Sequence, residues 1–199
     1  PALPSPATPE FPIRWKSPDD QQLMVNHANV FSREQLDQGA RFLLEHIPVC
    51  APKQRVIDLG CGNGVLGVAL LKQQPEAQVI FTDDSYMAVA SSKASVEANI
   101  PELMSQAEFR TDDCLASQAD QSLDYVVCNP PFHQQQAVTE HIAWQMFNDA
   151  KRCLKAGGKL RIVANRHLPY YEKMTVLLGG CRHIASNNKF VILESTKRK

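Results

Sequence analysis

The sequence has 199 residues, enough for one substantial domain, and its apolar fraction of 44% is ordinary for a globular protein. The formal net charge is zero, which argues against a strongly basic nucleic-acid-binding protein. It still allows an enzyme that contacts nucleic acid through one local patch. The apolar runs are short and interrupted by charge, so none approaches the roughly 20 residues that span a bilayer.

The cysteines are scattered and form no C-x-x-C pair; they are Cys50, Cys61, Cys114, Cys128, Cys153 and Cys181. We therefore expect neither a disulfide framework nor a metal site. Small buried thiols in a reducing compartment are the better interpretation, which places the protein in the cytoplasm.

Residues 1–24 begin with a proline-rich stretch that predicts an extended linker or strap, and residues 25–199 predict a single domain. Segments of this kind commonly join domains. We therefore expect an upstream domain that is absent from this chain.

The predicted elements start with a helix from Phe31 to Pro48, with Ser32 as its N-cap and Gln35 in the capping-box position. Short apolar runs then alternate with helical patterns. The predicted strands are 55–60, 77–84, 107–113, 122–129 and 156–165. The predicted helices are 64–74, 86–100, 137–154 and 170–180, and two closing strands lie within 181–195. On the helix at 137–154, Trp144 and Met146 are expected in the core.

This alternation indicates right-handed βαβ crossovers, and so an α/β fold with a doubly wound, mostly parallel sheet. The closing pair is a hairpin, so one end strand must run antiparallel. Ligands of such a sheet bind outside the carboxyl ends of the strands. Four consecutive strand ends carry glycine-rich or polar residues, at 58–64, 83–84, 112–113 and 129–132, which predicts a ligand cleft.

The first strand end places an acidic residue before three alternating glycines: Asp58, Gly60, Gly62 and Gly64. Residues 62–67 also match G-x-G-x-x-G, which leaves a nicotinamide-dependent dehydrogenase as a distant alternative. A carboxylate would repel a pyrophosphate but favour an aminoacyl group and a sulfonium cation. Capping of the loop or of the next helix is the alternative role for Asp58.

The next two strand ends offer carboxylates. Asp83 suits a ribose diol, because a carboxylate can accept from both hydroxyls, with Asp84 as its neighbour. Asp113 is assigned to an adenine amino group, with Asp112 as the fallback.

The fourth strand end is a stiff corner. Asn129 precedes proline and is therefore extended, while Pro130 and Pro131 fix their φ angles and lack N–H donors. The corner thus offers acceptors, which suit a substrate that donates from an NH2 group, and Phe132 offers a face for a planar base. Two acceptors that hold the hydrogens of an amine localise its lone pair for attack on an electrophilic methyl group. Asn129, Pro130 and Phe132 are the predicted catalytic residues.

The blocks VIDLGCGNGVLG, FTDDS and NPPFH resemble class I S-adenosylmethionine-dependent methyltransferases. Together with VFSREQLDQGARFLL, LKAGGKLRIVANRHLPYY and NNKFVIL, they resemble the bacterial ribosomal RNA guanine-N2 methyltransferases, the large-subunit (23S) more than the small-subunit (16S) enzymes. The resemblance covers about residues 25–195.

This resemblance implies a seven-stranded Rossmann-like sheet, S-adenosylmethionine as cofactor and ribosomal RNA or a ribosomal subunit as partner. It places Gly60, Gly62 and Gly64 against the aminoacyl part, Asp83 on the ribose, and residues 129–132 around the target amine, with Asn129 also touching the cofactor. It further implies that the chain is the C-terminal half of a two-domain protein.

Several residues have two open interpretations. His133 contacts RNA or only enters a helix, and Phe31 lines the cofactor entrance or is simply a core aromatic. Arg166 is assigned to RNA phosphates, with solvated surface as the alternative. Other targets left open are a 16S guanosine, adenine N6 and a protein glutamine amide, and a domain that binds RNA without catalysis is also considered.

Overall fold

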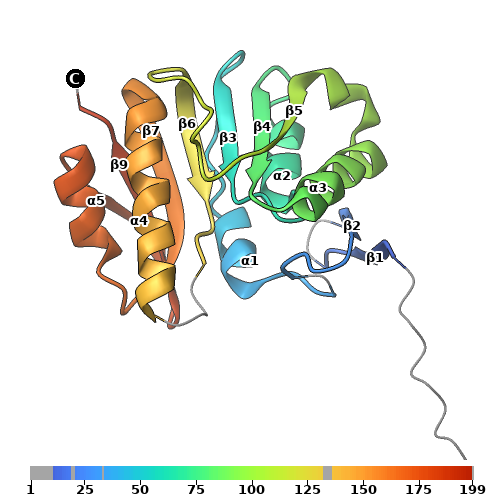
Figure 1. The fold of residues 1–199 in the computed structure, drawn as a ribbon, viewed down its shortest axis with the longest axis horizontal. Coiled ribbons are helices and arrows are strands. Elements are labelled where there is room, and N and C mark those ends of the chain that lie inside the picture. The colour runs from blue at the N-terminus through green and yellow to red at the C-terminus, as the bar shows by residue number, and fades with distance from the viewer. Residues whose placement is uncertain (1–10, 19–20, 33, 132–135, 199) are drawn as a thin grey trace, which may run out of the picture.

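The computed structural model describes residues 11–18, 21–32, 34–131 and 136–198, apart from the side chains of 136–140. Its centre is a seven-stranded sheet of order β5-β4-β3-β6-β7-β9-β8 (Figure 1). The strands are β3 (Arg55–Leu59), β4 (Gln78–Asp83), β5 (Ala107–Thr111), β6 (Leu123–Cys128), β7 (Leu154–Asn165), β8 (Arg182–Ser186) and β9 (Phe190–Thr196). In this sheet β9 runs in the direction opposite to the other six strands. The predicted doubly wound α/β fold is confirmed.

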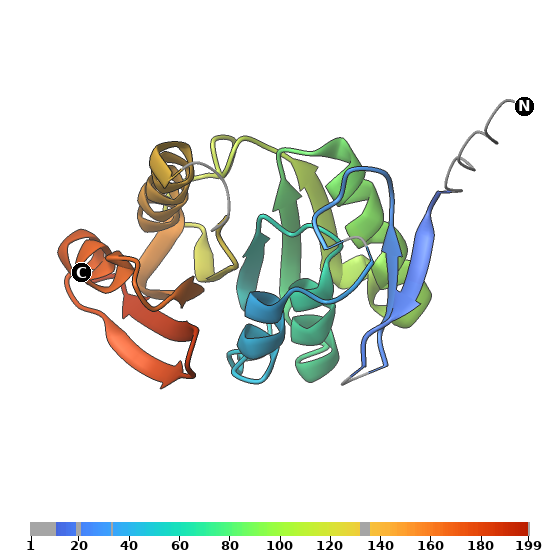
Figure 2. The same ribbon diagram turned by 90° about the horizontal axis from the view of Figure 1, so that it is seen from below.

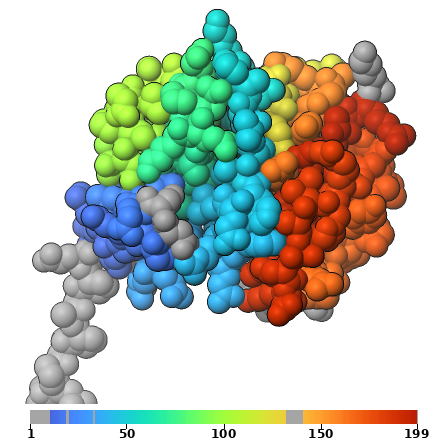
Figure 3. Space-filling view, turned by 180° about the vertical axis from the view of Figure 1, so that it is seen from behind, coloured from blue at the N-terminus to red at the C-terminus, as the bar shows by residue number. Residues whose placement is uncertain are grey.

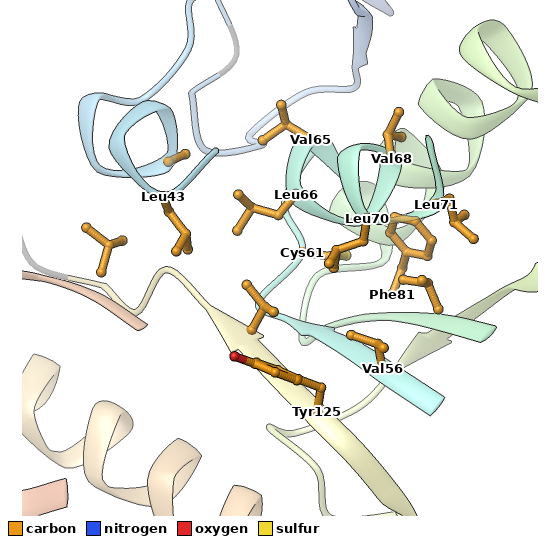
Figure 4. Close-up of a cluster of buried hydrophobic side chains, with 14 of the residues drawn as sticks. Leu43, Val56, Cys61, Val65, Leu66, Val68, Leu70, Leu71, Phe81 and Tyr125 are labelled. Carbon is orange, nitrogen blue, oxygen red and sulfur yellow. The ribbon is translucent and has the colours of Figure 1, made fainter. Parts of the chain in front are cut away.

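Helices cover both faces of the sheet (Figures 1 and 2). They are α1 (Gln38–Leu44), α2 (Val65–Gln73), α3 (Tyr86–Asn99), α4 (Gln136–Cys153) and α5 (Tyr170–Leu178), with a short 3-10 helix η1 (Pro101–Gln106). Successive strand residues point to opposite faces, so each strand serves two cores. Val56 and Val127 pack with α1 and α2 on one face, whereas Ile57 and Val126 pack with α4 and α5 on the other. Figure 4 shows the first of these cores.

A hairpin of β1 (Ile13–Lys16) and β2 (Leu23–Asn26) precedes the sheet and packs on α3 (Figure 3). Side chains of α3 accept from the free edge of β2: Asn99 Oδ1 from Leu23 N–H (2.8 Å), Ser95 Oγ from Val25 N–H (3.1 Å) and Ser91 Oγ from His27 N–H (2.8 Å). The donors are two residues apart along β2, and the acceptors are four residues apart along α3. Two strand residues advance about 6.6 Å and four helix residues about 6 Å, so each donor lies opposite its acceptor. Only an extended strap was predicted for residues 1–24 and no strand before residue 55, so both strands of this hairpin were missed.

The predicted start of the first helix was wrong. The helix begins at Gln38, with Asp37 as its N-cap, and Ser32 has a left-handed φ of 55°. Both Ser32 and Asp37 are cap-type residues, so the local pattern does not separate them. Trp144 was also misplaced, because it is 39% exposed, whereas Met146 is buried as predicted.

Candidate functional site

A cavity of about 430 Å³ lies at the carboxyl edge of the sheet. Its walls are the loop after β3, the ends of β4 and β5, the corner after β6, the segment that leads into α1, and one side of α4. The strand order reverses between β3 and β6, because β4 and β5 lie on one side and β7 on the other. The cavity therefore lies at the switch point of the sheet, where open α/β folds bind ligands.

The loop after β3 needs its glycines for backbone reasons. Gly60, Gly62 and Gly64 have φ angles of 72°, 52° and 82°, in the left-handed region that side chains rarely adopt. Gly60 and Gly62 line the cavity. Gly64 lies outside the lining: it is the N-cap residue of α2, and a Cβ there would lie 2.8 Å from Ser92 Cβ. Gly64 therefore supports the packing of α2 on α3.

Asp58 lies beneath the loop and does not line the cavity. Its side chain is 1% exposed, and its Oδ2 accepts from the N–H of Gly67 in the first turn of α2 (2.9 Å). Alternation along β3 explains this placement, since Asp58 shares the α2 face with Val56. Burial raises the pKa of Asp58 to about 8, although the Gly67 hydrogen bond opposes the shift. The contact is that of the helix cap considered in the sequence analysis.

Asp83 does line the cavity and joins the loop to β4. Its Oδ2 accepts from Gly62 N–H and its Oδ1 from Ser85 N–H, both at 3.0 Å. Each oxygen keeps a second lone pair for a ligand. Burial raises the pKa of Asp83, with the backbone hydrogen bonds opposing it and the adjacent Asp84 adding to it. Asp84 also lines the cavity, while Ser85 serves as the N-cap of α3.

The two carboxylates after β5 differ in their bonding. Asp112 accepts from both the backbone N–H (2.9 Å) and the hydroxyl (2.8 Å) of Ser117, so its side chain caps a turn. Asp113 accepts from Gln145 Nε2 of α4 at 3.0 Å. Both line the cavity, and Asp113 is the more exposed.

The corner after β6 brings a polar side chain against α1. Asn129 Nδ2 donates to Asp37 Oδ2 at 3.0 Å. Asn129 Oδ1 is buried and has no hydrogen-bond partner among the described residues. Asn129, Pro130 and Pro131 all line the cavity. Phe132 and His133 lie outside the described residues.

The structure thus brings six residues of the predicted site to the cavity: Gly60, Gly62, Asp83, Asp113, Asn129 and Pro130. Phe31 lines it too and is 61% exposed. Sequence reasoning missed Asp37, Cys114 and Gln145. An aspartate two residues before a core glycine is the only local signal for Asp37. In the part of the chain that the structure describes, no group of three His, Cys, Asp or Glu side chains could hold a metal.

Arg166 lies away from the cavity, on the exposed surface after β7, and its guanidinium donates to Asn187 O (3.3 Å). A second hollow of about 510 Å³ lies beside this turn, between α1 and the β8–β9 connection. It is lined by Gln38, Arg41 and Lys189 among others. Asp37 and Gln38 are consecutive, so the N-terminus of α1 separates the two hollows. No helix in the described part of the chain is long and apolar enough to cross a membrane.

Comparisons with known proteins agree with this architecture. The family model described as the methyltransferase small domain matches residues 21–194. A ribosomal RNA large subunit methyltransferase G of Cronobacter sakazakii is 52% identical over 198 residues, which are 98% of this chain and 52% of that protein. The protein of the same name from Serratia proteamaculans is 54% identical over 191 residues, 95% of this chain and 50% of that protein. The chain spans about half the length of these curated relatives.

Among solved structures, a T. thermophilus 16S rRNA N2 methyltransferase in complex with AdoMet and guanosine superposes with a TM-score of 0.79. It is 24% identical, and the match covers 97% of this chain and 52% of that chain. At this identity the likeness supports the fold, including the predicted seven strands.

Proposed function

Because the chain belongs to the methyltransferase small domain family, we propose that it transfers a methyl group from S-adenosylmethionine to the exocyclic N2 amine of a guanosine in ribosomal RNA, with 23S rRNA as the substrate. The observation that carries this proposal is the buried Asn129 Oδ1, an acceptor in the cavity wall without a partner among the described residues. Such an acceptor is costly to bury unless a donor arrives to use it. An NH2 group supplies that donor.

The residues of the cavity fit the cofactor. Asp83 would accept from the ribose hydroxyls and Asp113 from the adenine amine, because Asp112 is engaged with Ser117. The loop at Gly60 and Gly62 would contact the aminoacyl part. Several carboxylates around one cavity also favour a cationic ligand over a pyrophosphate. When bound, the cofactor supplies an electrophilic methyl group.

The chain's own contribution is to hold the amine. Asn129 Oδ1 accepts one hydrogen of the amine, and a backbone carbonyl of the proline corner accepts the other, so the nitrogen lone pair is localised. The localised lone pair would point at the methyl group that the bound cofactor supplies, and the nitrogen would take on that methyl group in exchange for one proton released to water. Positioning and preorganised acceptors account for the rate increase, with no covalent enzyme intermediate. The base must be unpaired or flipped out to reach this corner.

We assign the flanking RNA to the second hollow, because this hollow adjoins the cavity across the N-terminus of α1. Its charged residues are mostly positive: Arg41, Lys189 and the nearby Arg166, against one acidic residue, Glu45. Phe132 would stack on the target base, and His133 would contact RNA. RNA binding weakens as salt rises, and the slope of the logarithm of the binding constant against the logarithm of salt concentration measures the phosphate contacts. We expect Lys189→Ala and Arg166→Ala each to reduce the size of this slope by about one. Lys93→Ala on the exposed side of α3 is the control. We further propose a cytoplasmic location and an upstream domain in the full-length protein. The curated relatives are about twice as long as this chain.

The direct test is transfer of a tritiated methyl group to ribosomal RNA from cells that lack the gene, followed by nucleoside analysis. N2-methylguanosine in 23S rRNA supports the proposal. Label in 16S rRNA, on adenine N6 or on a protein glutamine would replace the target while keeping the chemistry. Asn129→Ala should abolish transfer, and a variant that still transfers would contradict the role of this amide.

A nicotinamide-dependent dehydrogenase remains the competing class, because residues 62–67 match its glycine pattern. Calorimetry with NADH and with S-adenosylmethionine separates the two. Binding of NADH but not of S-adenosylmethionine would overturn the proposed function. A domain that binds RNA without catalysis would bind the cofactor and RNA but would transfer no label.

A further inference from the structure

Asp37 connects the first helix to the proline corner. One carboxylate oxygen, Oδ2, accepts two hydrogen bonds: from the N–H of Ala40 at 2.8 Å and from the side-chain Nδ2 of Asn129 at 3.0 Å. Asp37 is half-buried and lines the cavity together with Asn129. The two residues are 92 positions apart in the sequence.

The contact fixes which way the Asn129 amide faces. A carboxylate can only accept hydrogen bonds, so the NH2 group of Asn129 is the end that meets Asp37. The oxygen of the amide must then lie on the other side, where Oδ1 is buried and has no partner among the described residues. The position of Asn129 agrees with this, because the alternation of Tyr125 and Val127 places it on the α1 face of β6.

The carboxylate is itself held in place. The N–H of Ala40 belongs to the first turn of α1, where backbone donors have no partner within the helix, and Asp37 is the N-cap. The N-terminus of α1 therefore fixes the position of the Asp37 carboxylate, and this carboxylate in turn fixes the orientation of the Asn129 amide. A negative charge on the donor side also strengthens the polarity of the amide oxygen through the chain of hydrogen bonds.

We propose that Asp37 is a positioning residue that keeps the Asn129 amide turned with its oxygen toward the substrate amine. This inference rests on the proposed methyl transfer to an amine. If the amide turned over, its NH2 group would meet the NH2 group of the substrate, donor against donor. If it were free to rotate, the acceptor would no longer be preorganised when the amine arrives.

Two substitutions separate positioning from capping. Asp37→Ser keeps a cap-type residue for Ala40, because serine ranks with aspartate at N-caps, but its shorter side chain ends before it reaches Asn129. Asp37→Asn keeps the length. Its single oxygen is drawn to Ala40 N–H, and from that place it can still accept from Asn129 Nδ2, as Oδ2 does now. Asn129→Ala is the reference for complete loss of the acceptor.

The variants are made in the natural protein that carries this chain, and four quantities are measured: kcat for methyl transfer to RNA, KM for RNA, the Kd for S-adenosylmethionine and the midpoint of thermal unfolding. We expect Asp37→Ser to lower kcat by about 20-fold, as expected for loss of a charge-assisted hydrogen bond, while the Kd changes less than about threefold. We expect Asp37→Asn to be at least about fivefold more active than Asp37→Ser, since it rescues the bond without the charge.

The proposal is overturned if Asp37→Ser keeps kcat within threefold of the unmodified protein, or if Asp37→Asn falls as far as Asp37→Ser. It is also overturned if the losses follow the unfolding midpoint, since a cap alone would then explain them. Failure of the proposed function looks different: the unmodified protein itself would transfer no methyl group to an amine.

Discussion

Gly67 is the last glycine of the G-x-G-x-x-G pattern, and Gly67→Ala tests whether this glycine is needed for the packing of α2 on the sheet and not for binding a ligand. Gly67 lies in the first turn of α2 and faces β4. A Cβ added there would lie 2.1 Å from Phe81 Cε1 and 2.5 Å from Cζ. The ring cannot easily move away, because Phe81 is fully buried and stacks on Phe109 with centroids 5.0 Å apart. The substitution must therefore push α2 away from the sheet.

The expected cost follows from this overlap. Overpacking of a core by one carbon costs about 1–3 kcal/mol, and an approach of 2.1 Å to a fixed ring belongs at the upper end, about 3 kcal/mol. For a chain of this size, each kcal/mol lowers the unfolding midpoint by about 2–4 °C, so the midpoint should fall by about 6–12 °C. Thermal unfolding followed by circular dichroism measures it.

Gly157→Ala is the matched control, because nothing lies within 4 Å of its added Cβ and only its φ of 81° is strained. It should cost about 1–2 kcal/mol. Phe81→Leu removes the ring that blocks Gly67. The double variant should therefore be more stable than the sum of the single changes by about 1 kcal/mol or more. The packing argument would be refuted if the effects of Gly67→Ala and Phe81→Leu on the free energy of unfolding were additive. It would also be refuted if Gly67→Ala cost no more stability than Gly157→Ala.

Three further predictions concern stability. The pKa of Asp58 is raised from 3.8 to about 8, so its favourable contribution is complete below pH 3.8 and is lost as pH rises toward 8; Asp58→Asn should flatten that part of the curve of unfolding free energy against pH. For Glu194, burial raises the pKa, but hydrogen bonds from Tyr125, Arg182 and Arg161 outweigh it and lower the value from 4.5 to about 2. Its stabilisation is therefore present above pH 4.5 and is lost as pH falls toward 2, and Glu194→Gln should lose less stability than the unmodified chain in acid titrations followed by fluorescence. Ser95→Ala should weaken the docked hairpin by about 1 kcal/mol, seen as faster hydrogen exchange at Val25 and unchanged exchange in the central strands.

Residues far apart in the sequence explain why part of the site could not be predicted. The sequence indicated Gly60, Gly62, Asp83, Asp113 and Asn129 because each follows a recognisable strand, and parallel strands end at one edge of a sheet. It did not indicate Asp37, because nothing local distinguishes that aspartate from Ser32 as a helix cap. The hairpin was not predicted for a similar reason. The backbone N–H groups at the free edge of β2 donate to side chains of α3, which lies far away in the sequence: Ser91, Ser95 and Asn99.

What the sequence alone determined is the order and type of the α-helices and strands from α1 onward, and the strand ends that carry chemistry. Both depend on periodicity and on backbone rules for glycine and proline, which act within a few residues. What only the tertiary structure decided is the direction of each polar group: Asp58 turned under α2, Asp112 turned to Ser117, and Asn129 held by Asp37. A hydrogen bond has a direction and a length of about 3 Å, and its partner is chosen by the packing of helices on the sheet, after the local pattern has formed.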